Sequence, residues 1–317
     1  MRTRIFVLCL FAVLLIVGAC VTLPEQKAVD GVTSGIRSTS GTKYFLYGAW
    51  GNSSSDIFAG GYNGSILHYD GKTWGTMTSG TTNAIYDIWG SSSSDVFAVG
   101  SGGIILHYDG NTWSAMTGGT IYKHILYGIW GSDSSDVFAV GSGGTIMHYN
   151  DKAWKEMTSG TTNALYYIWG SDSSNVFVVG SGGTILHYNG KTWDAMISGT
   201  VNHLYGICGS DPSDVFAVGI NGTILHYDGN IWGNMTSGTT DDLYCIWGNS
   251  SSDIFATGFN GTILHYAGKT WDAMTSGTAN ALYYIWGSSP SDVFAVGSNG
   301  TILHYDGEDW SLITGNN

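Results

Sequence analysis

Histidine and aspartate recur along the sequence, and these residue types are well suited to acid–base or nucleophilic chemistry. Seven of the nine histidines form a His-Tyr column, at His68, His107, His148, His187, His226, His265 and His304. Acidic residues form a second column, at Asp95, Asp136, Asp214, Asp253 and Asp292, with Asn175 replacing Asp in the fourth repeat. A Ser-His-Asp set could be assembled from any repeat, so the pattern selects no nucleophile. We expect both columns to serve the structure, in a buried hydrogen-bond network that also includes tryptophan.

Carboxylate pairs could instead bind a metal ion or cleave a glycosidic bond. Asp133 with Asp136, and Asp211 with Asp214, are spaced as Asp-x-x-Asp, and calcium prefers six to eight oxygen ligands. The spacing is not that of an EF-hand loop, and aspartates in Ser-rich turns often accept hydrogen bonds from nearby amides. No two carboxylates are fixed as the pair that glycoside hydrolysis needs. We therefore expect a protein that is not an enzyme and has no cofactor, with calcium as the remaining alternative.

The His-Tyr column is part of an internal repeat that fills most of the chain. Successive His-Tyr pairs are 39, 41, 39, 39, 39 and 39 residues apart. Two tryptophan columns follow the same period, and Cys208 replaces tryptophan once in the first of them. Seven repeats over residues 46–317 indicate a propeller or a solenoid.

Each repeat predicts four antiparallel strands. In 282–314, two strands flank a Ser-Pro-Ser-Asp turn, Asn299-Gly300 is a type I′ hairpin signal, and Asp306-Gly307 marks a further turn. A β-solenoid fits poorly because its coils carry no two-residue hairpins. We predict an all-β, seven-bladed β-propeller. Its blades are expected at 46–84, 85–125, 126–164, 165–203, 204–242, 243–281 and 282–317.

The repeat resembles two propeller families. Its order of an apolar strand, a Val-Gly strand, a Gly-x-Ile-Leu strand, an Asp-Gly turn and a tryptophan is similar to the Asp-box (sialidase-like) repeat and to the photosystem II assembly factor-type repeat. The turn Asp70–Trp74 is one residue shorter than the usual Asp-box loop. A sialidase site needs a cluster of arginines, whereas the chain after residue 19 has only Arg37. The resemblance therefore implies the fold and no activity.

The N-terminus predicts an exported lipoprotein. Arg2 and Arg4 precede an apolar run that ends in Val17-Gly18-Ala19-Cys20, which resembles the lipobox of bacterial lipoproteins. The resemblance implies a signal peptide at 1–19, acylation of Cys20, and a flexible tether at 20–45. The protein would then be membrane-anchored in a bacterial cell envelope, at the outer membrane or cell surface of a Gram-negative cell. The alternative is an uncleaved anchor with a buried Cys20.

Residues that depart from the repeat are the candidates for binding. The linker to the next blade and the turn between the second and third strands emerge on the same face of a propeller. Loops of this kind commonly carry function. The departures there are Tyr62, Tyr122, Lys123, His124, His203, Ile220, Asp241, Asp242 and Phe259. We expect the five of these from His203 onward to cluster over blades 5 and 6, with neutral variation at exposed turns as the alternative.

Three further departures and two cysteines fall on the innermost strands. Asp87, Tyr167 and Tyr284 could line the central channel, and simple tolerance beside solvent is the alternative. Cys208 and Cys245 should point the same way around the ring, as small apolar fillers. A disulfide between them is the less favoured alternative.

Composition limits the partners. Lysine and arginine number 11 against 24 acidic residues, for a net charge of −13, and nucleic-acid binding requires a basic surface. We expect a monomeric scaffold that binds a protein partner. The alternatives are a multivalent glycan-binding propeller, which needs an aromatic column exposed between blades, and a polysaccharide-active enzyme.

Overall fold

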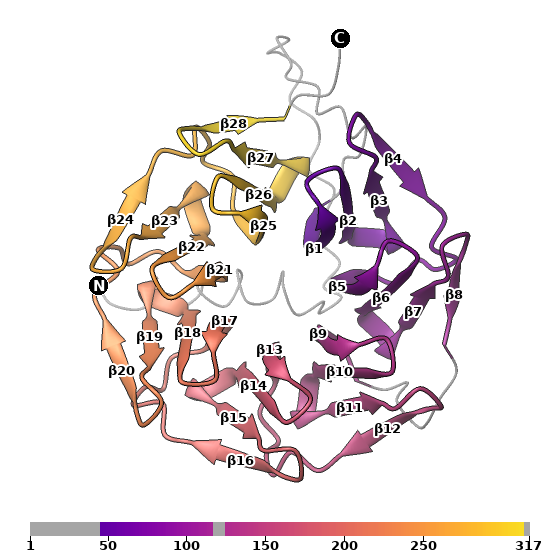
Figure 1. Ribbon diagram of the computed structural model, residues 1–317, viewed down its shortest axis with the longest axis horizontal. Coiled ribbons are helices and arrows are strands. Elements are labelled where there is room, and N and C mark those ends of the chain that lie inside the picture. Colours follow the sequence, from indigo (N-terminus) through magenta and orange to yellow (C-terminus); the bar gives the residue numbers. More distant parts are fainter. Residues whose placement is uncertain (1–44, 117–123, 314–317) are drawn as a thin grey trace, which may run out of the picture. The chain divides into compact units, whose positions relative to one another are not determined.

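The protein is a seven-bladed β-propeller with four antiparallel strands in each blade (Figure 1). The computed structural model describes residues 45–116 and 124–313. In this part of the chain every sheet consists of four consecutive strands, so no blade borrows a strand from elsewhere. The expected signal peptide, Cys20 and almost all of the tether lie outside the described residues. Among the described residues, no helix has the length and apolar character needed to span a membrane.

The two inner strands of each blade are the longer ones. The innermost strands are β1 (Leu46–Ser53), β5 (Ile85–Ser92), β9 (Leu126–Asp133), β13 (Leu165–Asp172), β17 (Leu204–Asp211), β21 (Leu243–Ser250) and β25 (Leu282–Ser289). The second strands are β2 (Asp56–Gly61), β6 (Asp95–Gly100), β10 (Asp136–Gly141), β14 (Asn175–Gly180), β18 (Asp214–Gly219), β22 (Asp253–Gly258) and β26 (Asp292–Gly297).

The two outer strands are shorter. The third strands are β3 (Ile66–Tyr69), β7 (Ile105–Tyr108), β11 (Ile146–Tyr149), β15 (Ile185–Tyr188), β19 (Ile224–Tyr227), β23 (Ile263–Tyr266) and β27 (Ile302–Tyr305). The outermost strands are β4 (Trp74–Met77), β8 (Trp113–Ala115), β12 (Trp154–Met157), β16 (Trp193–Met196), β20 (Trp232–Met235), β24 (Trp271–Met274) and β28 (Trp310–Leu312).

A short 3₁₀ turn joins the second and third strands of each blade. These turns are η1 (Tyr62–Gly64), η2 (Ser101–Gly103), η3 (Ser142–Gly144), η4 (Ser181–Gly183), η5 (Ile220–Gly222), η6 (Phe259–Gly261) and η7 (Ser298–Gly300). In η7, Asn299 has φ 55° and ψ 26°, Gly300 has φ 67°, and the Thr301 amide donates to the Ser298 carbonyl at 3.1 Å. This geometry confirms the type I′ turn predicted from Asn-Gly, because both central residues have positive φ.

The blades pack against one another through apolar faces on both sides. At one seam, Phe138 and Val140 of β10 pack with Ile168 of β13 and Val176 of β14. At the closing seam, Leu46 and Ala49 of blade 1 pack with Val296 and Ile302 of blade 7. Buried apolar residues therefore lie at every seam, and the ring needs all of its blades to cover them.

The His and Asp columns form a repeated hydrogen-bonded pair, as expected, but the pair is partly exposed rather than buried. The Nε2 atom of histidine lies 2.5–2.7 Å from Oδ1 of aspartate in six blades. Asp56, which the sequence analysis left out of the column, pairs with His68 in the first blade. A serine adds a second bond in several blades, for example from Ser132 Oγ to Asp136 Oδ2 at 2.6 Å. Stacking on a buried phenylalanine, such as Phe138 on His148 with centroids 4.2 Å apart, holds each imidazole ring.

Tryptophan does not join this network, so that part of the expectation is wrong. The Nε1 atoms of six tryptophans on the outermost strands are buried and have no hydrogen-bond partner in the described part of the chain. Trp154 Nε1 instead lies 3.4 Å from Met116 Sδ. These rings face the apolar seam, where Trp193 contacts Tyr188 and Phe138. Their contribution is therefore packing.

The fourth blade shows what replacing the aspartate does. Asn175 Nδ2 donates to Asp172 rather than interacting with His187, and His187 Nε2 is buried with no partner. Burial lowers the pKa of His187, because the charged imidazolium is poorly solvated there.

We predict that Asp214→Asn lowers the free energy of unfolding by about 1–2 kcal/mol, because His226 loses a charged acceptor. Asn175→Asp should raise it by less, since the new carboxylate would lie beside Asp172. Denaturant titration of the two variants tests this. An Asp214→Asn protein as stable as the parent would contradict a stabilising role for the pair.

Candidate functional site

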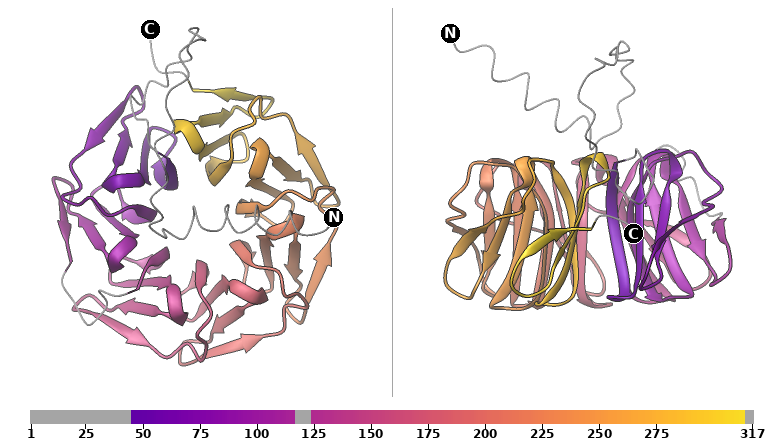
Figure 2. Two further views of the ribbon diagram at one scale, coloured as in Figure 1. Left: turned by 180° about the vertical axis from the view of Figure 1, so that it is seen from behind. Right: turned by 90° about the horizontal axis from the view of Figure 1, so that it is seen from above.

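One face of the ring carries the η turns and the linkers between blades, and we call it the loop face. Backbone hydrogen bonds join the two kinds of segment, for example from Ile220 N to the His203 carbonyl at 3.0 Å and from Phe259 N to the Asp242 carbonyl at 2.9 Å. The turns between strands one and two, and between strands three and four, lie on the opposite face, which we call the turn face (Figure 2). Loop tips can therefore vary without altering the strands between them.

The structure brings together the five sequence-predicted residues of blades 5 and 6. His203 Nδ1 accepts a hydrogen bond from Gly182 N at 2.9 Å, which connects it to η4 of blade 4. Asp242 Oδ1 accepts from Asn221 N in η5 at 2.8 Å. With the two backbone bonds above, these contacts form a continuous chain from blade 4 to Phe259 in blade 6. Whether these residues bind a partner stays a prediction.

The other predicted residues do not join this cluster. Tyr62 belongs to blade 1 and is 54% exposed. His124 lies beside η3 of blade 3, near Gly143. Tyr122 and Lys123 lie outside the described residues.

The two aspartates of the cluster keep the local structure of the repeat and add charge. In other blades asparagine at the Asp241 position donates to a threonine of the next turn, as Asn163 does to Thr184 Oγ1 at 2.8 Å. At Asp241 the direction is reversed, and Thr262 Oγ1 donates to Oδ2 at 2.7 Å. Neither Asp241 nor Asp242 forms a salt bridge with any described residue. The loop face therefore carries two adjacent carboxylates without a paired cation.

Two exposed apolar residues beside the cluster were missed by the sequence analysis. Ile197 is 90% exposed and Val201 is 85% exposed, both in the linker from blade 4 to blade 5. The signal was present, because the same linker positions in blade 3 are Thr158 and Thr162. Both changes look like variation in a surface loop until the structure places them in a groove with Gly182, whose amide donates to His203.

Seven tyrosines form a closed ring about the propeller axis. A β-bulge makes the second residue of each innermost strand an extra one: Leu46 pairs with Gly61 and Gly48 with Gly60, which leaves Tyr47 between them. The ring consists of Tyr47, Tyr86, Tyr127, Tyr166, Tyr205, Tyr244 and Tyr283, with neighbouring centroids 5.4–6.1 Å apart. His203 lies between two of its members, Tyr166 and Tyr205. The candidate cluster therefore contacts this ring through His203.

The three innermost-strand departures meet next to the tyrosine ring. Tyr167 OH donates to Tyr284 OH at 2.6 Å, which joins blades 4 and 7. Asp87 is only 2% exposed and accepts from Ile88 N at 2.9 Å and from Ile129 N at 3.0 Å. Burial raises the pKa of Asp87 to about 7, while the two backbone bonds and the Tyr284 hydroxyl oppose the shift. Asp87 is thus a buried group, not one that lies beside solvent.

The two innermost-strand cysteines are free and buried. Cys208 packs with residues of blade 6, including Leu243 and Ile246, while Cys245 packs with Ile285 and Val293 of blade 7. Each points toward the next blade, as expected, and the alternative of a disulfide is wrong.

In each Asp-x-x-Asp pair the first aspartate accepts hydrogen bonds within its own turn, and the second pairs with a histidine. Asp133 Oδ1 accepts from Ser135 N at 2.7 Å and from Ser135 Oγ at 2.6 Å, while Asp136 pairs with His148. Among the described residues, no group of three His, Cys, Asp or Glu side chains is arranged to hold a metal ion. Calcium binding stays an untested alternative.

Comparison with known structures supports the fold. YCF48 bound to D1 peptide is 18% identical over 83% of this chain and 94% of its own, with a TM-score of 0.71. YCF48 from Cyanidioschyzon merolae is 15% identical over 84% and 97%, with a TM-score of 0.70. No family model matches the chain, and no curated protein is significantly similar to it. At this identity the likeness shows a shared propeller fold, in agreement with the assembly factor-type repeat, and nothing about activity.

We predict that Asp87 makes the protein less stable as pH rises from about 4 to 7. The folded pKa of about 7 exceeds the unfolded value of 3.8, so in this window only the folded state retains the proton. Across the whole window the free energy of unfolding therefore falls by up to ~4 kcal/mol. Denaturant unfolding across this pH range should show a fall that Asp87→Asn reduces. Parallel curves for the two proteins would contradict the assignment.

Proposed function

We propose that the protein is a non-catalytic binding module that holds a protein partner on the loop face over blades 5 and 6. One observation carries the proposal: His203, Ile220, Asp242 and Phe259 depart from the repeat and are brought together by the linker-to-turn backbone bonds that every blade makes. Asp242 adds a side-chain bond to the amide of Asn221. A rigid ring of near-identical blades positions this cluster and leaves it exposed at Phe259, which is 44% accessible.

The structural neighbours support a protein partner over the alternatives. One of them was solved with a peptide bound, so a propeller of this architecture can hold a peptide. The tryptophans of the outermost strands offer little surface to a glycan, since Trp113, Trp154, Trp193, Trp232 and Trp271 are each at most 8% exposed. The polysaccharide-active enzyme stays an untested alternative.

The exchange of Phe259→Ser together with Asp241→Asn should reduce partner capture at least tenfold. Both substitutions restore residues found in other blades, so thermal unfolding should be nearly unchanged. The measurement is quantitative cross-linking of the full chain to envelope proteins. Ile231→Thr is the matched control, because Ile231 is 68% exposed but lies in a turn of the turn face. Equal capture by the parent and the double variant would contradict the proposal.

We further propose that the protein is exported and anchored to a membrane through acylated Cys20. The support is the run of residues from Arg2 to Cys20 in the sequence, and stable attachment would need two or more acyl chains.

Cys20→Ser should move the protein from the membrane fraction to the soluble fraction, because no acyl chain could then be attached. Fractionation of cells that express each form tests this. Continued membrane association of the variant would show that the apolar run itself is the anchor.

A further inference from the structure

The linker from blade 4 to blade 5 has two exposed apolar residues where the linkers after blades 1, 3 and 5 have threonine. Ile197 and Val201 occupy positions that are threonine in blade 1 (Thr78, Thr82), blade 3 (Thr158, Thr162) and blade 5 (Thr236, Thr240). Their exposures of 90% and 85% show that neither side chain is needed by the core. Two neighbouring changes from threonine to β-branched apolar residues therefore alter only what this surface can contact.

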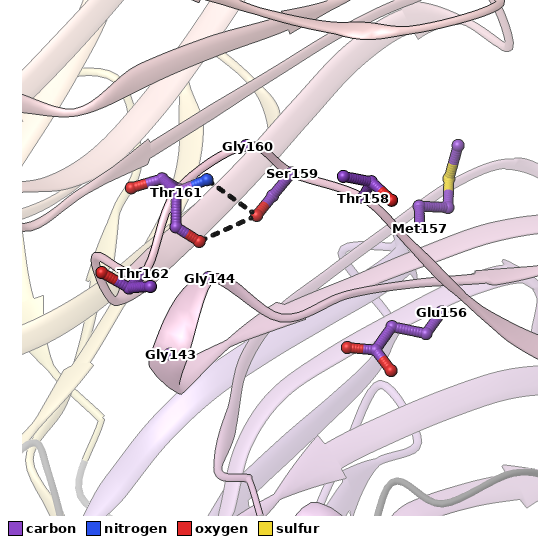
Figure 3. Close-up of a pocket in the computed structure, with 9 residues that line it drawn as sticks. All are labelled: Gly143, Gly144, Glu156, Met157, Thr158, Ser159, Gly160, Thr161 and Thr162. Carbon is purple, nitrogen blue, oxygen red and sulfur yellow. Dashed lines mark hydrogen bonds between the residues drawn. The ribbon is translucent and has the colours of Figure 1, made fainter.

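These residues line a shallow groove that the repeat provides. In blade 4 it holds about 570 Å³ between Gly182 and Gly183 of η4 and the linker from Met196 to Val201. Figure 3 shows the corresponding groove of blade 3, where Ser159 Oγ bonds to the backbone of Thr161 and the neighbouring side chains are Thr158, Thr162 and Glu156. Ser198 makes the same bonds to Thr200 in blade 4. The two grooves thus have the same backbone hydrogen bonds, and they differ in the polarity of the side chains that line them.

The apolar groove continues into the cluster over blades 5 and 6. Gly182, which lines the groove, donates to His203 Nδ1 at 2.9 Å. The His203 carbonyl accepts from Ile220, and the next residue, Asn221, donates to Asp242. A chain of contacts therefore links the groove to Asp242, whose carbonyl accepts from the amide of Phe259.

Charge determines what can lie along this chain of contacts. Asp241 and Asp242 each use one carboxylate oxygen in a hydrogen bond within the fold, and neither has a basic partner among the described residues. The chain as a whole carries a net charge of −13. A lysine or arginine would form a charge-assisted hydrogen bond with either carboxylate, whereas an acidic segment would be repelled.

We propose that the loop face of blades 4 to 6 binds an extended basic segment of a partner protein, with an apolar side chain in the Ile197–Val201 groove and a lysine or arginine at Asp241 and Asp242. This inference rests on the proposed function and specifies the chemistry of the partner. The apolar contact supplies affinity by removing exposed hydrocarbon from water. The carboxylates select basic segments over acidic ones.

The test is selection of random peptides displayed on phage against the full chain, followed by binding measurements on synthetic copies. We expect the selected peptides to combine basic and apolar residues. Ile197→Thr with Val201→Thr should weaken their binding about tenfold or more. Asp241→Asn with Asp242→Ala should weaken it similarly and abolish its dependence on salt. All four substitutions restore residues of other blades, so the fold should be retained.

Thr158→Ile with Thr162→Val, added to the Ile197→Thr, Val201→Thr protein, is the matched control. It builds an apolar groove on blade 3 away from the carboxylates, and we expect it to restore no binding. Restored binding would overturn the role of the acidic pair. Selected peptides that are acidic, or that bind both double variants as well as the parent, would overturn the inference while leaving the proposed function intact.

Two other outcomes separate the inference from the function on which it rests. Failure to select any peptide on the parent protein would contradict peptide binding itself. Sedimentation of the full chain adds a second check. If the parent is a dimer and the Ile197→Thr, Val201→Thr variant is a monomer, this surface is a contact between two copies. That result would overturn a basic partner.

Discussion

The contact between a tryptophan of one blade and a glycine of the next is the constraint on which the ring depends. A Cβ atom at Gly51 would lie 2.6 Å from the ring of Trp286, and the same steric limit holds at Gly90, Gly131, Gly170, Gly209 and Gly287. Glycine is required at these positions for close approach, and its φ there is not the left-handed one. Because the contact between Gly51 and Trp286 joins the last blade to the first, it also closes the ring.

The seam between blades 5 and 6 departs from this rule. Cys208 replaces the tryptophan, and a Cβ at Gly248 would meet Ile254 and the Asp253 carbonyl, with no indole among the nearest atoms. Here Cys208 packs with Leu243 and Ile246, so the seam stays apolar with a smaller side chain. The same two blades carry the cluster of departures on the loop face. Exceptions in the core and on the surface thus coincide in one sector.

Much of the fold could be predicted from the sequence because it is repeated. Periodic tryptophans, His-Tyr pairs in all seven repeats and Asn-Gly at the η turn in four of them predict the same blade. The tryptophan network was mispredicted because spacing alone does not say which face of a strand a side chain occupies. The burial of Asp87, which the sequence suggested could line the central channel, was not predictable, because its partners Ile129 and Tyr284 are 42 and 197 residues away in the sequence.

The candidate site was only partly predictable for the same reason. The meeting of His203, Ile220, Asp242 and Phe259 follows from the rule that linkers and η turns share a face. Ile197 and Val201 were missed because a change from threonine in a loop has no meaning until its neighbours are known. The tyrosine ring is repeated in the sequence, yet its closure depends on a bulge in each innermost strand.

Hydrogen–deuterium exchange of the full chain, with and without a selected basic peptide, tests the central claim most directly. The claim is that one sector of a nearly symmetric ring has become a binding surface. It predicts slower exchange at 197–203, 220–222, 241–242 and 259–261, and no change in the equivalent segments of blades 1 to 3. Equal protection of every blade, or protection confined to the turn face, would contradict the account.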